Sequence, residues 1–248
     1  MDELKEKFSN TINMSKISSD PFDHLYIENF FEDAFYQKMQ ENIPNIDHFE
    51  KITDTGTVTN YSPQRYILSL QRDVKKIPEN QQKFWNEINT AFTSVEFWNA
   101  ISSKFAKTLK ERFANLTKKE KEILGENPKI SCRTALIKDF TKYQLGAHTD
   151  SPNKMFSFLF YMPKNNELKN IGTSLYRPHD IIDDEEITKH FSRDQTSLRF
   201  EKIKTCEFKK NSVFIFARTN YSFHGVEEIN INQSERNLFL LNFYGNKN

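Results

Sequence analysis

The sequence has few cysteines, no long apolar run and no excess of charge of either sign. Its two cysteines, Cys132 and Cys206, lie far apart and form no C-x-x-C pair, which excludes a disulfide framework and a thiolate zinc site. Each is expected to be a small buried apolar residue. No segment approaches the ~20 apolar residues that a membrane-spanning helix needs, and residues 1–20 contain no secretory-type apolar run. We therefore expect a cytoplasmic protein with no membrane partner.

The charges of the chain nearly balance. There are 35 basic and 34 acidic residues, so no overall field attracts nucleic acid, and we expect no nucleic-acid partner. The 23 phenylalanines supply abundant core material. A chain of 248 residues is expected to form a single domain over 1–248, because barrels and sandwiches of this length are often undivided.

Residues 1–128 favour a helix-rich region. A short strand is expected at 21–27, and Asn29 and Glu32 have the spacing of a capping box for a helix that ends near Pro44. Between residues 79 and 124, apolar side chains recur at helical spacing and predict buried helix faces: Phe84, Trp85, Ile88, Phe92, Phe97, Trp98, Ile101 and Phe105.

Residues 129–248 favour short strands. From Ile130 the apolar period changes towards two, most clearly at 156–161, where phenylalanines alternate with other residues. Further strands are expected at 173–177, 206–208, 212–217, 224–229 and 237–244. The long, charged segment 177–204 is expected to form a lid over a compact pocket. The whole pattern predicts a mainly β fold, a sandwich or jelly roll, with an N-terminal helical layer packed outside it.

Three residues form a candidate metal and catalytic site. His148 and Asp150 lie two apart in a strand-like segment, so their side chains point to the same side. His224 begins another strand-like stretch and could supply a second imidazole. Two histidines and one carboxylate occupy one face of an octahedral metal and leave three positions open. Taken singly, each could equally be a structural or surface residue.

Catalytic zinc is the other metal that such residues could hold. The H-E-x-x-H motif that is typical of zinc hydrolases is absent, however. The remaining histidines are interpreted as structural or surface residues, with His179 the strongest exception because it follows an expected strand: His24, His48, His179 and His190.

Arg236 is a candidate anion-binding residue. It shares a strand face with Leu238 and Leu240, so its guanidinium is expected to enter an apolar interior. A buried guanidinium needs an anionic partner, and its planar fork matches a carboxylate. That partner is either the carboxylate of a ligand or a protein acid, for which the nearby candidates are Glu227, Glu228 and Glu235.

The order of His148, Asp150, His224 and Arg236 resembles the 2-oxoglutarate/Fe(II)-dependent dioxygenase superfamily. The stretches YQLGAHTDSPNKMFSFLFYMP (143–163), GTSLYRP (172–178), NSVFIFA (211–217) and SFHGV (222–226) are similar to its prolyl-4-hydroxylase-like branch. The resemblance covers residues 130–245. It implies a catalytic core over 129–248 with the cupin-like double-stranded β-helix, or jelly roll.

The same resemblance implies a chemistry. Its cofactors would be Fe(II), 2-oxoglutarate as co-substrate, and O₂, and the reaction would hydroxylate an unactivated C–H bond with release of succinate and CO₂. Arg236 would hold the far carboxylate of 2-oxoglutarate. Many relatives add a Ser or Thr two residues later, where this chain has Leu238, so the second anchor is sought among Tyr143, Tyr161 and Thr173. Asp150 favours hydroxylation over halogenation, because halogenating relatives have a small residue there.

Several substrates and one other class of function stay open. The expected lid favours a small molecule or glycan-type precursor, while the family branch also suggests a protein or peptide substrate. Arg177, His179 and Arg218 are candidate substrate contacts. The alternative is a non-catalytic jelly-roll module that binds a structural metal or none, with the same three residues forming an anion or sugar site. The sequence predicts no particular oligomeric state.

Overall fold

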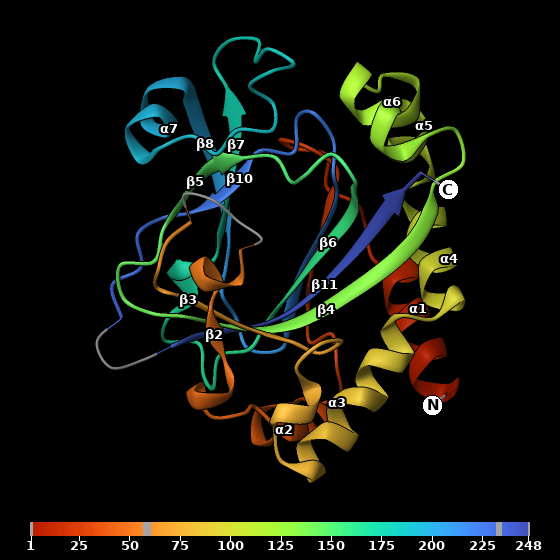
Figure 1. Cartoon of the computed structure of the whole chain (residues 1–248), viewed down its shortest axis with the longest axis vertical. Helices are drawn as coiled ribbons and strands as arrows, with labels where there is room; N and C mark the ends of the chain where they lie inside the picture. Colours follow the sequence, from red (N-terminus) through yellow and green to blue (C-terminus); the bar gives the residue numbers. More distant parts are fainter. Residues whose placement is uncertain (1, 57–60, 232–234, 248) are drawn as a thin grey trace.

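The computed structural model describes residues 2–56, 61–231 and 235–247 (Figure 1). Its helices are α1 (Asp2–Met14), α2 (Asp33–Glu41), α3 (Glu79–Phe92), α4 (Val95–Lys104), α5 (Ala106–Ala114), α6 (Lys118–Leu124) and α7 (Arg193–Arg199). Its strands are β1 (His24–Glu28), β2 (Glu50–Lys51), β3 (Arg65–Ser69), β4 (Lys129–Asp139), β5 (Leu145–His148), β6 (Lys154–Tyr161), β7 (Thr173–Pro178), β8 (Phe200–Cys206), β9 (Ser212–Ala217), β10 (His224–Val226) and β11 (Arg236–Asn246).

The strands form two antiparallel sheets. The larger has the order β1-β9-β6-β11-β4-β3-β2, and the smaller has the order β5-β10-β7-β8. From β4 onward the chain passes back and forth between them, since β4, β6, β9 and β11 belong to the larger sheet and β5, β7, β8 and β10 to the smaller, where β7 and β8 follow each other and pair. The fold is therefore mixed helix and sheet, with a β-rich second half as predicted.

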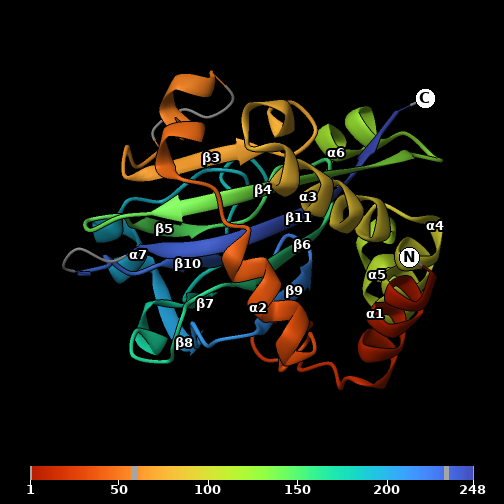
Figure 2. The ribbon, with the colours of Figure 1, turned by 90° about the horizontal axis from the view of Figure 1, so that it is seen from below.

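The two faces of the larger sheet have different cores, because strand residues alternate between faces. Phe156, Phe158 and Phe160 of β6 point outward and pack with α1, α3 and α4, whereas Leu159 and Tyr161 point inward, towards the smaller sheet. Figure 2 shows α1 and α3 to α5 on one side of the larger sheet, and β5, β7, β8 and β10 on the other side together with α7. The period-two pattern of 156–161 thus predicted both faces correctly.

The helical region differs in detail from the sequence prediction. Residues 79–124 form four helices, α3 to α6. The capping box at Asn29 and Glu32 is wrong, because Asn29 has a left-handed backbone (φ 52°) and Glu32 makes no side-chain cap to α2. The backbone of Phe31 instead exchanges hydrogen bonds of 2.9 and 2.7 Å with the Asn211 side chain.

The strand boundaries also changed. Strand β3, which the sequence pattern missed, pairs with β4, and β8 ends at Cys206 instead of beginning there. Segment 177–204 is not a simple lid, because its second half contains α7 and most of β8. Among the described helices, none is long and apolar enough to cross a membrane.

The helical layer and the larger sheet should unfold together, and Phe92 is the test position. The Phe92 ring is fully buried, and its centroid lies 4.6 Å from the ring centroid of Phe8 on α1 and 5.1 Å from that of Phe160 on β6. Phe92→Ala should lower the free energy of unfolding by about 3–5 kcal/mol through the cavity it leaves. The matched control is Val95→Ala at a side chain that is 70% exposed, with an expected change within about 0.5 kcal/mol. Urea unfolding followed by fluorescence and circular dichroism measures both, and two separated transitions would contradict a single cooperative unit.

Candidate metal centre and buried charge cluster

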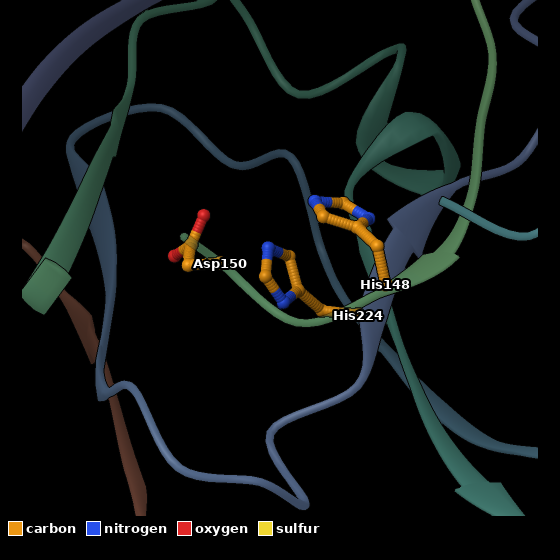
Figure 3. Close-up of side chains that lie close together, drawn as sticks. All are labelled: His148, Asp150 and His224. Atoms are coloured by element: carbon orange, nitrogen blue, oxygen red, sulfur yellow. The ribbon is translucent and has the colours of Figure 1, made fainter. Parts of the chain in front are cut away.

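The structure brings His148, Asp150 and His224 together. His148 ends β5 and His224 begins β10, and the two residues are directly paired across these antiparallel strands. One ligand atom from each of the three side chains lies within 4.8 Å of the others. Figure 3 shows both imidazoles and the carboxylate turned towards a common space. Two nitrogens and one oxygen on one side of that space could hold a divalent metal ion.

Two glycines allow this close approach. A Cβ on Gly225, which follows His224, would lie 2.4 Å from the carbonyl oxygen of Leu145. A Cβ on Gly146 would lie 2.0 Å from the carbonyl oxygen of Phe191. Both distances are shorter than any side chain tolerates, so only glycine lets β5, β10 and the segment before α7 pack against one another.

Backbone carbonyls orient the two imidazoles. His148 Nδ1 lies 3.0 Å from the carbonyl oxygen of Gly146, and His224 Nδ1 lies 2.9 Å from that of Ser222. Each Nδ1 therefore carries the proton and donates it, which leaves Nε2 with a free lone pair. Burial lowers the pKa of both histidines. Neutral imidazoles with a fixed tautomer are the form that binds a metal.

Asp150 is held in its ionised form. Its carboxylate accepts a 2.7 Å hydrogen bond from Lys154 Nζ and a 2.5 Å hydrogen bond from Ser157 Oγ. Burial acts to raise the pKa of Asp150, but the charge and the hydrogen bond of Lys154 outweigh burial, and the pKa is lowered. Both bonds orient the carboxylate, as partners of metal-ligating groups commonly do.

His190 is a neighbour of the site that the sequence reasoning missed. Its ring stacks on His148 with 4.4 Å between centroids and 19° between planes. The His190 ring also lies 5.8 Å from the ring of Tyr61, centroid to centroid. No local pattern indicated this, because His190 lies in the segment that was expected to be a lid. It closes one side of His148 without joining the three converging side chains.

Arg236 is fully buried but has a protein partner that the sequence did not suggest. Its Nη1 donates to Asp139 Oδ2 at 2.7 Å, and its Nε donates to the carbonyl oxygen of Ile171 at 2.8 Å. Asp139, in place of the expected glutamates, is the residue paired with Arg236 across β4 and β11. The third nitrogen, Nη2, has no hydrogen-bond partner.

A second arginine binds the same carboxylate. Arg65 of β3 donates from Nε to Asp139 Oδ1 at 2.6 Å and from Nη2 to Oδ2 at 2.8 Å. Burial acts to lower the pKa of Arg65, but Asp139 outweighs it and the pKa is raised. Two buried guanidinium groups thus share one carboxylate, and the cluster of Arg65, Asp139 and Arg236 carries a net charge of one positive unit.

The candidate second anchors differ in whether their hydroxyls already have hydrogen-bond partners. The Tyr161 hydroxyl donates to Thr173 Oγ1 at 2.7 Å, so these two hydroxyls are partners of each other. The Tyr143 hydroxyl is buried without a partner. Its ring packs under Arg65, 4.3 Å from the guanidinium carbon, and Arg236 is among the charges that act on it, although burial dominates and raises its pKa. Of the three candidate anchors, Tyr143 is therefore the one with a buried hydroxyl that has no partner, and it packs against Arg65 of the same charge cluster.

The three candidate substrate contacts are not grouped. Arg177 lies at the surface and pairs with Asp20 and Glu201, and His179 is exposed at the end of β7. Arg218 is fully buried and donates to the carbonyl oxygen of Asp150 at 3.2 Å. In the part of the chain that the structure describes, Arg218 has no partner in common with the other two.

A cleft of about 960 Å³ adjoins the site. Its walls come from residues 61–64, 142, 144–146, 176, 188–193, 195–197 and 226–228. His190 belongs both to this wall and to the stack on His148. Amides and charged groups such as Gln64, Gln144 and Arg193 line the cleft beside apolar side chains, so it offers hydrogen-bond partners to a ligand.

Metal titration should separate the three converging residues from His190. His224→Ala should weaken Co(II) binding more than about 100-fold, because losing a ligand exceeds the 10–100-fold loss typical of outer partners. His190→Phe keeps the aromatic stack and should leave the affinity nearly unchanged. Isothermal titration of each folded variant measures this, and an equal loss in His190→Phe would make His190 a fourth ligand.

No protein-family model matches the sequence, and no curated protein matches it significantly. Three solved structures are similar in outline. An oxidoreductase of the 2OG-Fe(II) oxygenase family from Burkholderia pseudomallei has 8% identity and a TM-score of 0.47, covering 97% of this chain and 89% of that chain. A prolyl-4-hydroxylase from Pseudomonas putida has 9% identity and a TM-score of 0.46, covering 98% and 100%. HygX from Streptomyces hygroscopicus, determined with nickel, 2-oxoglutarate and hygromycin B bound, has 7% identity and a TM-score of 0.42, covering 89% and 82%. Likenesses this low do not establish a shared fold or activity, so function has to be inferred from the side chains described above.

Proposed function

We propose that this protein is an Fe(II)- and 2-oxoglutarate-dependent oxygenase that hydroxylates an unactivated C–H bond of a small polar molecule or glycan-type precursor. The proposal includes the finer fold assignment, a double-stranded β-helix, which the passage of the chain from β4 to β11 back and forth between the two sheets supports. One observation supports it above all: the chain combines a three-residue metal site that leaves coordination positions free with a buried charge cluster that has one unbalanced positive charge.

The metal part of the proposal rests on the chemistry of the donors. Two neutral imidazoles and an ionised carboxylate suit Fe(II) and leave coordination positions for other ligands. His148, Asp150 and His224 would hold the ion, and the bonds to Gly146, Ser222, Lys154 and Ser157 keep these side chains in place before it binds. Such preorganisation is what a metal site with open positions requires.

The co-substrate part rests on the charge cluster. Arg65, Asp139 and Arg236 carry one unbalanced positive charge in an interior where an unpaired charge is costly. Arg236 Nη2 and the Tyr143 hydroxyl are buried donors without acceptors. One carboxylate would supply the missing negative charge and accept from both donors. Tyr143 would then be the second anchor, which Leu238 cannot provide.

The two parts share one interior. Phe216, whose ring lies 4.6 Å from His224, belongs to the same buried cluster as Tyr143, Tyr161 and Leu238. A dicarboxylate with its far end on Arg236 would therefore enter the same space as the metal ligands. When bound, Fe(II) and 2-oxoglutarate supply the oxidation of a C–H bond by O₂, with succinate and CO₂ as products. The protein's part is to orient these groups and to exclude water with its aromatic walls.

The substrate part rests on the cleft beside His190. The polar groups in its walls and the position of His190 next to His148 support a ligand with several hydroxyl or amino groups, presented from this side. A peptide is the competing substrate. Incubation with 2-oxoglutarate, Fe(II) and either a panel of amino sugars and polyols or proline-containing peptides, followed by mass spectrometry, distinguishes them by which gains one oxygen atom.

Binding of 2-oxoglutarate should depend on Arg236 and Tyr143. Arg236→Ala should raise the dissociation constant at least about 30-fold, which corresponds to about 2 kcal/mol or more, and Arg236→Lys should recover little because an ammonium lacks the planar fork. Tyr143→Phe should weaken binding about 10–100-fold, the usual value of a hydrogen bond to a charged group. Calorimetry in the presence of Mn(II) measures the dissociation constant of 2-oxoglutarate for each variant.

Tyr161→Phe is the matched control, since the Tyr161 hydroxyl already donates to Thr173. If Tyr161→Phe weakened binding as much as Tyr143→Phe, Tyr143 would not be an anchor.

Slow formation of succinate tests the enzyme itself without knowledge of the substrate. The purified protein with Fe(II), ascorbate, O₂ and 2-oxoglutarate should produce succinate above a blank without protein, because metal and co-substrate are held together even without a C–H bond to attack. Zn(II) in place of Fe(II) should stop it, since Zn(II) has no redox chemistry. The variants Asp150→Gly and Arg236→Ala should also stop it. A protein that binds neither Fe(II) nor 2-oxoglutarate would instead be the non-catalytic binding module.

A further inference from the structure

A second buried charge cluster lies on the outer side of the candidate metal centre. It consists of Arg112 from α5, Glu120 from α6 and Arg218, which follows β9, and their exposures are 6%, 1% and 0%. The carboxylate oxygen Glu120 Oε1 accepts hydrogen bonds from both guanidinium groups. Burial of charged groups this deep is costly, so the contacts that they make indicate what the cluster does.

Arg112 and Arg218 both donate to the same turn of the backbone. Arg112 Nη1 donates to the carbonyl oxygen of Lys154, and its Nη2 donates to that of Pro152, both at 2.7 Å. Arg218 Nε donates to the carbonyl oxygen of Asp150 at 3.2 Å. Three carbonyl groups between residues 150 and 154 are thus fixed by two side chains from outside the turn.

This turn carries the carboxylate that meets the two histidines. Lys154, whose carbonyl oxygen is bound by Arg112, donates from Nζ to Asp150 Oδ1 at 2.7 Å. The position of the Asp150 side chain therefore depends on the turn through its own backbone and through Lys154.

The cluster reaches the turn before His224 as well. Arg218 Nη1 donates to Asn220 Oδ1 at 2.7 Å. In the same turn, the hydroxyl of Ser222 donates to the carbonyl oxygen of Thr219 at 2.9 Å. The carbonyl oxygen of Ser222 accepts a hydrogen bond from His224 Nδ1, also at 2.9 Å. One cluster is therefore connected to the segments that present two of the three converging side chains.

We propose that Arg112, Glu120 and Arg218 are positioning residues, through which the N-terminal helices hold Asp150 in register with His148 and His224. This rests on the proposed function, because it assigns the three residues to the metal site. Glu120 neutralises one of the two guanidinium charges and keeps both side chains on the turn. The helical layer then has a part in metal affinity and does more than cover the sheet.

The test compares variants that disturb the cluster with one that only weakens α6. Arg112→Lys keeps the positive charge but cannot donate to two carbonyl groups with the geometry of a guanidinium fork. Glu120→Gln keeps the side-chain oxygen for the backbone N–H of Thr117 but removes the negative charge. Thr117→Ala is the matched control. It removes the hydroxyl that caps α6 and leaves the charged groups in place, so it lowers stability without touching the turn.

The readouts are Co(II) affinity and the Co(II) absorption spectrum of the full chain, measured well below the unfolding temperature of each variant. Arg112→Lys and Glu120→Gln should lose about 10–100-fold in affinity, as partners of metal ligands do, with a changed spectrum. Thr117→Ala should lower the unfolding temperature and leave affinity and spectrum unchanged. A wild-type protein that binds no Co(II) would overturn the proposed function and this inference together. Wild-type affinity in both cluster variants, or an equal loss in Thr117→Ala, would overturn only the positioning role.

Discussion

The interior of this protein depends on one carboxylate that is shared by two arginines. Asp139 binds Arg65 from β3 and Arg236 from β11, and it comes from β4, the strand between them. All three side chains are buried, so Asp139 can neutralise only one of the two charges. Three strands are joined at this point by ionic hydrogen bonds, and the same point carries one unbalanced positive charge. The structural partner and the proposed ligand are therefore not alternatives for Arg236, because Nη1 binds Asp139 while Nη2 has no partner.

The residues that sequence reasoning placed correctly are those fixed by local geometry. Arg236 shares a face of β11 with Leu238, so strand alternation alone sets where its side chain points. The phenylalanines of β6 followed the same rule. Asp150 lies two residues beyond His148, the last residue of β5, and its carboxylate is held by Lys154 and Ser157. The meeting of His148 and His224 required more, namely that β5 and β10 be neighbours, and the resemblance to a known family supplied that expectation.

The residues that sequence reasoning missed have positions that depend on contacts between distant segments. The pairing of Asp139 with Arg236 follows from the register of β4 and β11, and Arg65 arrives on a strand that had no clear pattern. His190 reaches His148 from a segment of mixed turns and helix. The failed capping box has the same cause: Asn211 takes the backbone groups of Phe31, and a tertiary contact thereby overrides a local signal.

The charge cluster of Arg112, Glu120 and Arg218 joins the helical layer to the site between the two sheets. Aromatic packing from α1, α3 and α4 fixes the outer face of β6, and α5 and α6 carry Arg112 and Glu120 to the turn at the beginning of that strand. β6 in turn presents Ser157 to Asp150 on its inner face. A shift of the helices against the sheet would thus move a carboxylate relative to two imidazoles that different strands hold. Because coordination tolerates displacements of only a few tenths of an ångström, the apolar packing outside the sheet and the polar site inside it constrain each other.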